Sequence, residues 1–122
     1  GYDPLFLTAL IITESSFYNR ARSNRNAHGL MQLKPATAVA LASEIHLQWK
    51  GTHTLYDPKK NIALGAYYLS KLVDRFGDLT LALEAYNQGP SRLSRFLRKG
   101  YLPQRYSKKV LKNYRRIRFQ PI

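Results

Sequence analysis

One glutamate stands out among the residues that could do chemistry. Glu14 ends a strongly apolar segment, seven residues after Leu7 and three after Ile11, so it falls on an apolar stripe of a predicted helix. A carboxyl group on such a stripe loses hydration, which raises its pKa. A carboxylic acid with a pKa near neutrality is suited to general acid catalysis. The alternative is a glutamate at a frayed helix end that reaches water or pairs with an arginine.

The sequence offers few other catalytic groups. His28, His46 and His53 lack the spacing of metal ligands, and the chain has no cysteine to join them. They are therefore predicted to be surface or packing residues, and no metal or cofactor is expected. Ser23 has no histidine at a recognisable triad spacing. The sequence also lacks a glycine-rich phosphate loop and a calcium-binding loop.

Polar segments accompany Glu14 along the chain. Residues 14–17 read Glu-Ser-Ser-Phe, and Ser23 follows Glu14 by nine positions. Residues 27–32 read Ala-His-Gly-Leu-Met-Gln, and residues 85–90 read Ala-Tyr-Asn-Gln-Gly-Pro. Each segment is a weak signal alone, because tyrosine and asparagine near a helix end are more often a packing residue and a cap. Their order and spacing together are more informative.

Helices must position these segments. Asp3-Pro4 and Asp57-Pro58 each pair an N-cap with proline at the first helical position, which predicts helices over 5–18 and from 58 to 76. The first of these has apolar side chains all round and is expected to be the central, buried helix. Further helices are predicted over 35–45, over 79–87, over 92–98 with Ser91 as cap, and from after Pro103 to 118; residues 20–29 are predicted to form a loop.

Composition indicates one folded domain with a basic surface. The chain of 122 residues is 44% apolar and has no sustained period-two alternation, which favours a single all-α domain. Its 20 basic and 7 acidic residues give a formal charge of +13, and eleven of the basic residues lie between Arg92 and Arg118. No acidic residue follows Glu84. Such a surface attracts a polyanion, whether nucleic acid, an anionic membrane surface or an anionic cell-wall polymer.

In order and spacing, these segments resemble the catalytic domain of the soluble lytic transglycosylases, a family related in fold to goose-type lysozyme. The resemblance covers essentially the whole chain and extends to further matching positions: Asp57-Pro58, Asn61-Ile62, Leu64-Gly65, Tyr68-Leu69, Phe76-Gly77 and Tyr106 with Val110. It implies one lysozyme-like helical catalytic domain over residues 1–122, excised from or processed out of a longer chain. It also implies a periplasmic or cell-envelope location, although this chain contains no targeting segment.

The resemblance implies roles for the first polar segments. Glu14 matches the single catalytic acid of the family, and Ser23 matches a serine near the scissile bond and the N-acetyl group. Gln32 closes the Gly-Leu-Met-Gln motif, while Gly29 and Met31 are expected to shape the same wall of the cleft. Ser23, Gly29, Met31 and Gln32 are therefore predicted to bind substrate.

The later segments supply the opposite side of the expected site. Tyr86 and Asn87 match a pair beneath the site, where the Tyr86 hydroxyl is expected to hold the catalytic carboxyl group. Tyr106 matches a tyrosine of the last helix that lines the groove. All three are predicted to contact substrate.

Two positions depart from the family pattern. Asn26 stands before Ala27 where the family usually has glycine in this loop. Asparagine tolerates a left-handed backbone, so the turn is expected to survive. Lys34 stands where some relatives have an apolar residue, which could alter a substrate contact.

The family's reaction needs only one carboxyl group, and this suits the scarcity of acids. Ordinary glycosidases use two carboxylates across the scissile bond, whereas no other acid of this chain lies in a motif facing Glu14. The resemblance implies that Glu14 cleaves the β-1,4 bond after N-acetylmuramic acid in peptidoglycan glycan strands. It would act first as acid and then as base, giving a 1,6-anhydro product without water. The chain is expected to act as a monomer.

Two other functions remain open from the residues. A muramidase would hydrolyse the same bond with water. A basic nucleic-acid-binding module would use the residues from Arg92 to Arg118, with Tyr101, Tyr106 and Tyr114 interleaved to stack on bases. The same basic cluster could instead be a solvated helix face. We favour electrostatic association with the anionic cell envelope and expect no nucleic-acid partner.

Overall fold

The computed structural model describes residues 3–119 of the chain. Its regular elements follow in the order α1 (Pro4–Ser15), α2 (Pro35–Glu44), the 3-10 helix η1 (Thr52–Tyr56), α3 (Pro58–Phe76), α4 (Leu79–Gln88), α5 (Pro90–Arg98) and α6 (Arg105–Phe119). Within this range the only β-type pairing is two isolated bridges in the loop after α1, Arg22 with His28 and His28 with Leu33. The all-α prediction is therefore confirmed for the described residues.

Acidic caps begin three of the helices. The side chain of Asp3 accepts a hydrogen bond from the Leu5 amide at 2.9 Å, Asp57 accepts one from Lys59 at 3.0 Å, and Asp78 accepts one from Leu81 at 2.9 Å. These carboxylates satisfy amides of the first helical turn that have no partner within the helix. The caps predicted at Asp3 and Asp57 are present as expected.

Other helix boundaries differ from the prediction. α1 ends at Ser15 rather than near residue 18, because Ser16 and Phe17 turn the chain into the left-handed region at φ 51° and 65°. α5 begins at Pro90, one residue before the predicted cap Ser91, because proline has a helical φ and no amide to satisfy. The short η1 was not predicted, since five residues show too little periodicity to detect.

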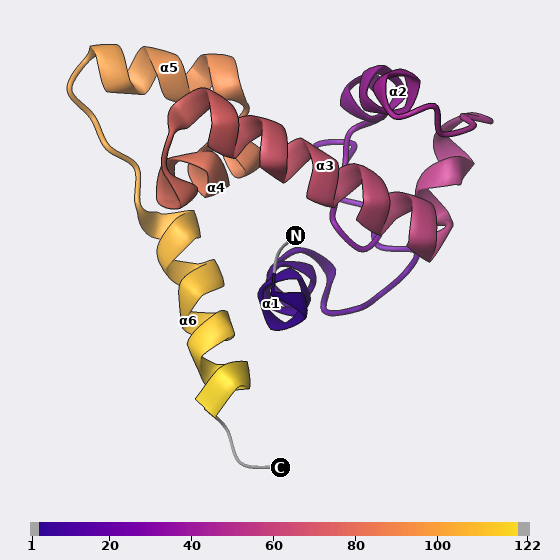
Figure 1. Cartoon of the computed structure of the whole chain (residues 1–122), viewed down its shortest axis with the longest axis horizontal. Coiled ribbons are helices and arrows are strands. Elements are labelled where there is room, and N and C mark those ends of the chain that lie inside the picture. Colours follow the sequence, from indigo (N-terminus) through magenta and orange to yellow (C-terminus); the bar gives the residue numbers. More distant parts are fainter. Residues whose placement is uncertain (1–2, 120–122) are drawn as a thin grey trace.

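α3 runs through the middle of the molecule (Figure 1). It packs against α4, η1 and α2, and it buries Leu64, Leu69 and Leu72 in the core. α6 extends away from this centre and packs against α1. α1 buries only part of its surface, since Leu10 is fully buried whereas Leu5 is 40% exposed. The central helix is therefore α3, and the expectation that the first helix is central was wrong. α1 lies at the flank, and its C-terminal end leads into the loop over residues 16–34.

Candidate active site

A cleft of about 350 Å³ opens at the C-terminal end of α1. Its lining comes from α1, the loop over residues 16–34, α2, α3 and the end of α4: Glu14, Ser23, Arg25, Ala27, Gln32, Leu33, Lys34, Thr37, Tyr68, Tyr86, Asn87, Gln88, Gly89 and Pro90. Glu14 is the single acidic residue in this lining. Five of the eight residues predicted for the site are thus brought together: Glu14, Ser23, Gln32, Tyr86 and Asn87.

Glu14 has the ionisation behaviour that its apolar stripe predicts. Burial raises the pKa of its carboxyl group from 4.5 to about 7, against the opposing effects of a hydrogen bond from Tyr106 and the positive charge of Lys109. Desolvation thus outweighs both stabilising partners of the charged form. A carboxyl group in this state is half protonated at neutral pH and can either donate or accept a proton.

The tyrosine that holds Glu14 is Tyr106, and the expectation for Tyr86 was wrong. The Tyr106 hydroxyl, from the first turn of α6, donates a hydrogen bond to Oε2 of Glu14. The Tyr86 hydroxyl instead donates to the backbone carbonyl of Met31 at 2.6 Å. Both tyrosines have a pKa raised well above 10, with burial as the largest cause. Tyr106 therefore remains a protonated donor to the carboxyl group across the accessible pH range.

Tyr86 anchors the loop that forms one wall of the cleft. Its bond to the Met31 carbonyl joins α4 to a backbone segment 55 residues earlier. Its ring also packs against Tyr68 of α3, with ring centroids 5.4 Å apart. Tyr86 thus lines the cleft with its ring while its hydroxyl fixes the wall.

Asn61 of α3 organises the same wall from below. Its side-chain oxygen accepts from the Met31 amide at 2.8 Å, and its amide nitrogen donates to the carbonyls of His28 and Leu55 at 3.1 and 2.9 Å. Gly29 leaves room for this contact: a Cβ there would lie 2.2 Å from the Asn61 nitrogen, and its φ is +81°. Glycine is needed at this position both for the space and for the backbone conformation.

Gly29 and Met31 do not reach the cleft surface, contrary to the prediction that they bind substrate. Neither belongs to the lining, and the Met31 side chain is fully buried. It packs so closely on Gly65 of α3 that a Cβ there would lie 2.5 Å from the Met31 sulfur. These two residues support the wall from behind. This explains why they occur in one motif with Gln32, which lines the cleft.

Gln32 and Ser23 line the cleft and also bond to their own loop. Gln32 has a left-handed backbone at φ 51°, and its side-chain nitrogen donates to the carbonyls of Ala21 and Gly29 at 3.1 and 2.9 Å. The Ser23 hydroxyl oxygen accepts from the amides of Arg25 and Ala27, both at 3.2 Å. These bonds use the Gln32 nitrogen and a Ser23 acceptor, so the Gln32 oxygen and the Ser23 hydroxyl proton have no partner among residues 3–119 and can meet a ligand.

Asn26 keeps the turn, as expected for a residue that tolerates the left-handed region. Its φ is 61°, and its side-chain oxygen lies 2.7 Å from Nε2 of His28. The other ring nitrogen of His28 lies 2.6 Å from the Tyr56 hydroxyl. Burial is the main cause that lowers the pKa of His28, with Arg22 as the second. His28 is thus a neutral packing residue of the loop, as predicted.

A second hollow of about 320 Å³ adjoins the cleft at Asn87 and Gln88. Tyr106 and the buried carboxylate Glu84 line it, together with Tyr101, Pro103, Arg105 and Lys109. Tyr106 therefore holds Glu14 and lines this second hollow rather than the main cleft. No role was predicted for Glu84, although it lies between the apolar residues Leu83 and Ala85, and this is a signal of the same kind as that of Glu14.

The basic residues of the C-terminal third are interleaved with three tyrosines, Tyr101, Tyr106 and Tyr114. All eleven basic residues from Arg92 to Arg118 are exposed; we call them the basic face. Of the three tyrosines interleaved with them, Tyr106 bonds to Glu14, and the Tyr114 hydroxyl donates to Asp3 at 2.7 Å. Tyr101 is 55% exposed and packs edge-on against Phe96. Two of the three tyrosines are thus bonded to carboxylates within the protein.

The described residues, 3–119, contain neither a metal-binding cluster nor a membrane-spanning helix. No group of three or more His, Asp or Glu residues in that range is placed to hold a metal ion. None of the helices described there has the length and apolar character to cross a membrane.

Comparisons with known proteins agree with this geometry. The model of the transglycosylase SLT domain family matches residues 1–108. A transglycosylase of Enterobacteria phage PRD1 is 39% identical over 111 residues, which are 91% of this chain and 37% of the phage protein.

Solved structures extend the match to the fold. An inactive glutamate-to-glutamine mutant of the lytic transglycosylase Slt from Pseudomonas aeruginosa aligns with a TM-score of 0.82 and 31% identity, over 93% of this chain and 21% of that one. The 70-kDa soluble lytic transglycosylase of Escherichia coli aligns with a TM-score of 0.82 and 26% identity, over 98% of this chain and 22% of that one. This confirms the expected lysozyme-like all-α fold. The chain spans little more than a third of the phage relative and about a fifth of the two solved chains. With the cleft, the acid and the family model in agreement, the chain belongs to the transglycosylase SLT domain family.

Proposed function

We propose that this chain is a lytic transglycosylase catalytic domain that cleaves the β-1,4 bond between N-acetylmuramic acid and N-acetylglucosamine in peptidoglycan. The observation that carries the proposal is the state of Glu14. It is the one acidic residue in the cleft lining, and burial raises its pKa to about 7. A group with this pKa can serve as acid and then as base within one turnover at neutral pH. The inactive glutamate-to-glutamine mutant of the Pseudomonas aeruginosa relative fits a mechanism that depends on one glutamate.

In the first step Glu14 acts as the acid. Tyr106 donates to Oε2, so the transferable proton resides on Oε1. Glu14 gives this proton to the glycosidic oxygen, the bond from that oxygen to C1 of N-acetylmuramic acid breaks, and N-acetylglucosamine leaves with a free 4-hydroxyl. The acetamido group of the substrate stabilises the cationic carbon. The Tyr106 hydrogen bond stabilises the carboxylate that forms on Glu14.

In the second step Glu14 acts as the base. Its carboxylate takes the proton of the C6 hydroxyl, and O6 closes onto C1 to give the 1,6-anhydro product. The acid is thereby regenerated, and no water is consumed. A second carboxylate is not needed, which suits a cleft whose lining contains a single acid.

Four residues of the cleft are proposed to hold the sugar. Ser23 and Gln32 offer the hydroxyl proton and the amide oxygen that the loop leaves without partners. Tyr86 lines the cleft beside them, and Asn87 is exposed at the junction of the cleft and the second hollow. Hydroxyl and acetamido groups of an amino sugar are suited to such contacts. Lys34 adds a cation to this wall, where some relatives have an apolar residue.

Digestion of purified sacculi followed by mass spectrometry tests the proposal. We expect 1,6-anhydromuropeptides from the wild-type chain and none from Glu14→Gln, a variant that keeps the shape of the side chain but cannot transfer a proton. Muropeptides with a reducing end, heavier by one water, would assign the chain as a muramidase. Full turnover by Glu14→Gln would remove Glu14 from its role.

We also propose that the basic face guides the domain to the cell envelope. Its eleven exposed cations lie on α5, on the segment that follows it and on α6, and the carboxylates of peptidoglycan stems give the wall a negative charge. Long-range attraction of this kind weakens as salt shortens the Debye length from about 30 Å at 0.01 M to about 8 Å at 0.15 M. Wall binding and turnover should therefore fall as salt rises. Turnover that does not change over this range would exclude a steering role.

A further inference from the structure

Two of the seven acidic residues are withdrawn from solvent, and the proposed mechanism uses only one. Glu14 is partly buried in the cleft, and Glu84 is 1% exposed. The other five are exposed: Asp3, Glu44, Asp57, Asp74 and Asp78. Removing a carboxylate from water is costly, and an apolar residue of similar size is often as stable in its place. Glu84 therefore needs an explanation other than general stability.

Glu84 serves the first turn of α6. Its Oε2 accepts the backbone amide of Ser107 at 2.6 Å. Ser107 is the third residue of α6, so its amide has no acceptor within the helix. A carboxylate at this end also interacts favourably with the helix dipole, and the bond is charge-assisted. Glu84 thus ties α4 to the start of α6.

The residue next to Ser107 is Tyr106, the tyrosine that donates to Glu14. The two buried carboxylates therefore bind neighbouring residues of one helical turn: Glu84 through the Ser107 amide and Glu14 through the Tyr106 hydroxyl. A shift of this turn moves the phenol relative to the catalytic carboxyl group. We propose that Glu84 is a positioning residue for Glu14, acting through the placement of Tyr106; this rests on the proposed function.

The charges around Glu84 are consistent with a role in the site. Arg105 and Lys109 line the hollow that Glu84 faces, so its charge has cations nearby. Lys109 also acts on Glu14, and the Glu84 charge is among the causes that raise the pKa of Tyr106. Glu84 thus helps to keep Tyr106 protonated as well as placed.

A double-mutant cycle separates this role from simple stabilisation. Glu84→Met removes the acceptor but retains the length of the side chain, and we expect kcat to fall about fivefold with KM unchanged, through misplacement of the phenol. In a Tyr106→Phe background the same change should alter kcat by less than about twofold, because the hydroxyl through which Glu84 acts is gone. An equal loss in both backgrounds, or an unchanged kcat for Glu84→Met, would overturn the proposal.

Two further Glu84 variants and one control variant extend the cycle. Glu84→Gln keeps an oxygen for the Ser107 amide and should restore kcat to within about twofold of wild type; a loss equal to that of Glu84→Met would contradict the proposal. Glu84→Leu repeats the test if Glu84→Met does not fold. Glu44→Met is the control, since Glu44 is an exposed glutamate that lines neither the cleft nor the second hollow, and it should leave kcat unchanged in both backgrounds.

The titration of Glu14 gives a result that does not depend on turnover. Loss of the Tyr106 hydrogen bond raises the Glu14 pKa, since this bond lowers it. We therefore expect a raised Glu14 pKa by carboxyl NMR in Glu84→Met and in Tyr106→Phe, with no further rise in the double variant. This result would hold even if sacculi were not cleaved, so failure of the proposed function is distinguishable from failure of the Glu84 assignment. A Glu14 pKa that Glu84→Met leaves unchanged would refute the assignment.

Discussion

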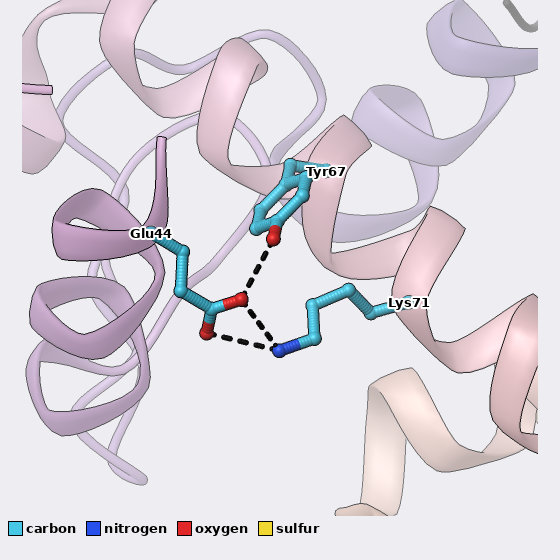
Figure 2. Close-up of polar contacts among 3 residues, drawn as sticks. All are labelled: Glu44, Tyr67 and Lys71. Atoms are coloured by element: carbon cyan, nitrogen blue, oxygen red, sulfur yellow. Dashed lines mark hydrogen bonds and ion pairs between the residues drawn. The ribbon is translucent and has the colours of Figure 1, made fainter. Parts of the chain in front are cut away.

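Two glutamates of this molecule each accept a hydrogen bond from a tyrosine but differ in their chemistry. Glu14 lies near the C-terminal end of α1 and accepts a hydrogen bond from Tyr106 of α6, while Glu44 ends α2 and accepts one from Tyr67 of α3. Figure 2 shows Glu44 with Tyr67 and with Lys71, whose ammonium nitrogen lies 2.8 Å from Oε1. Burial raises the pKa of Glu14 to about 7, whereas the hydrogen bonds from Lys71 and Tyr67 lower that of Glu44.

The comparison shows that a hydrogen bond from tyrosine is not what raises the pKa of Glu14. Each carboxylate accepts a hydrogen bond from its own tyrosine, and this bond lowers the pKa in both cases. The difference lies in the surroundings: Glu44 is exposed and has an ion pair, while Glu14 is enclosed in the cleft with Lys109 as its main charged neighbour. Desolvation therefore decides which of the two can act as a general acid.

The largest expected effect is on turnover. Glu14→Gln should lower kcat on sacculi by a factor of at least about 10³, because the variant can neither donate nor accept the proton. Glu44→Gln is the matched control and should leave kcat within about twofold of wild type, because a distant exposed group takes no part in the proton transfers. Equal losses for the two variants would erase the contrast between them. The measurement is release of anhydromuropeptides by mass spectrometry.

The second effect is on stability and has opposite signs at the two sites. The folded pKa of Glu14 lies above its unfolded value, so the folded state binds the proton more tightly and loses stability as pH rises from 4.5 through 7. A shift from 4.5 to about 7 corresponds to about 3 kcal/mol. Glu14→Gln lacks this loss, so its unfolding free energy relative to wild type should increase by about that amount between pH 4.5 and pH 8.

Glu44 supplies the reverse case in the same titration. Its folded pKa is lowered, so it contributes stability above its unfolded pKa and loses it as pH falls through the folded value. Glu44→Gln should therefore be slightly less stable than wild type at neutral pH, and the difference should vanish in acid. Denaturant unfolding of both variants over this pH range measures both signs. The same pH trend in both would show that burial does not distinguish the two groups.

The third effect comes from the two tyrosines. Tyr106→Phe should lower kcat about tenfold, since Glu14 loses its orienting bond. It should also move the alkaline limb of the kcat profile to higher pH. The Tyr106 hydrogen bond lowers the Glu14 pKa in the wild type, so its loss raises that pKa. Tyr67→Phe removes the equivalent bond from Glu44 and should change neither kcat nor its pH dependence. A profile that Tyr106→Phe leaves in place would mean that the phenol does not tune the acid.

Short-range features of this molecule could be predicted from the sequence. Asp3 and Asp57 are caps because an acid before proline has one favourable use at a helix start. Glu14 could be recognised because its apolar stripe predicts its burial, and the raised pKa follows from that. The left-handed turn at Asn26 was expected because the family usually has glycine there and asparagine tolerates this conformation, and the structure gives it φ 61°.

Features that depend on contacts between distant segments could not be predicted. The bond from Tyr106 to Glu14 joins residues 92 positions apart, and the bond from Tyr86 to the Met31 carbonyl joins residues 55 apart. No local pattern says which tyrosine hydroxyl meets which acceptor, so the two roles were exchanged. Gly29 and Met31 were predicted to bind substrate because they belong to the same motif as Gln32. A motif shows that its residues act together, but it does not show which of them faces the ligand.

The smallest expected effect concerns Glu44, the exposed glutamate of the pair, alone. Lys71→Ala removes the ion pair of Glu44 and should raise the Glu44 pKa, since the Lys71 hydrogen bond is the largest cause that lowers it. The Tyr67 bond remains and lowers the Glu44 pKa more than desolvation raises it, so this pKa should not reach that of Glu14. Turnover should not change, and Tm should fall only slightly, as expected for an exposed ion pair. If the Glu44 pKa instead rose to that of Glu14, the cation rather than burial would be what separates the two glutamates.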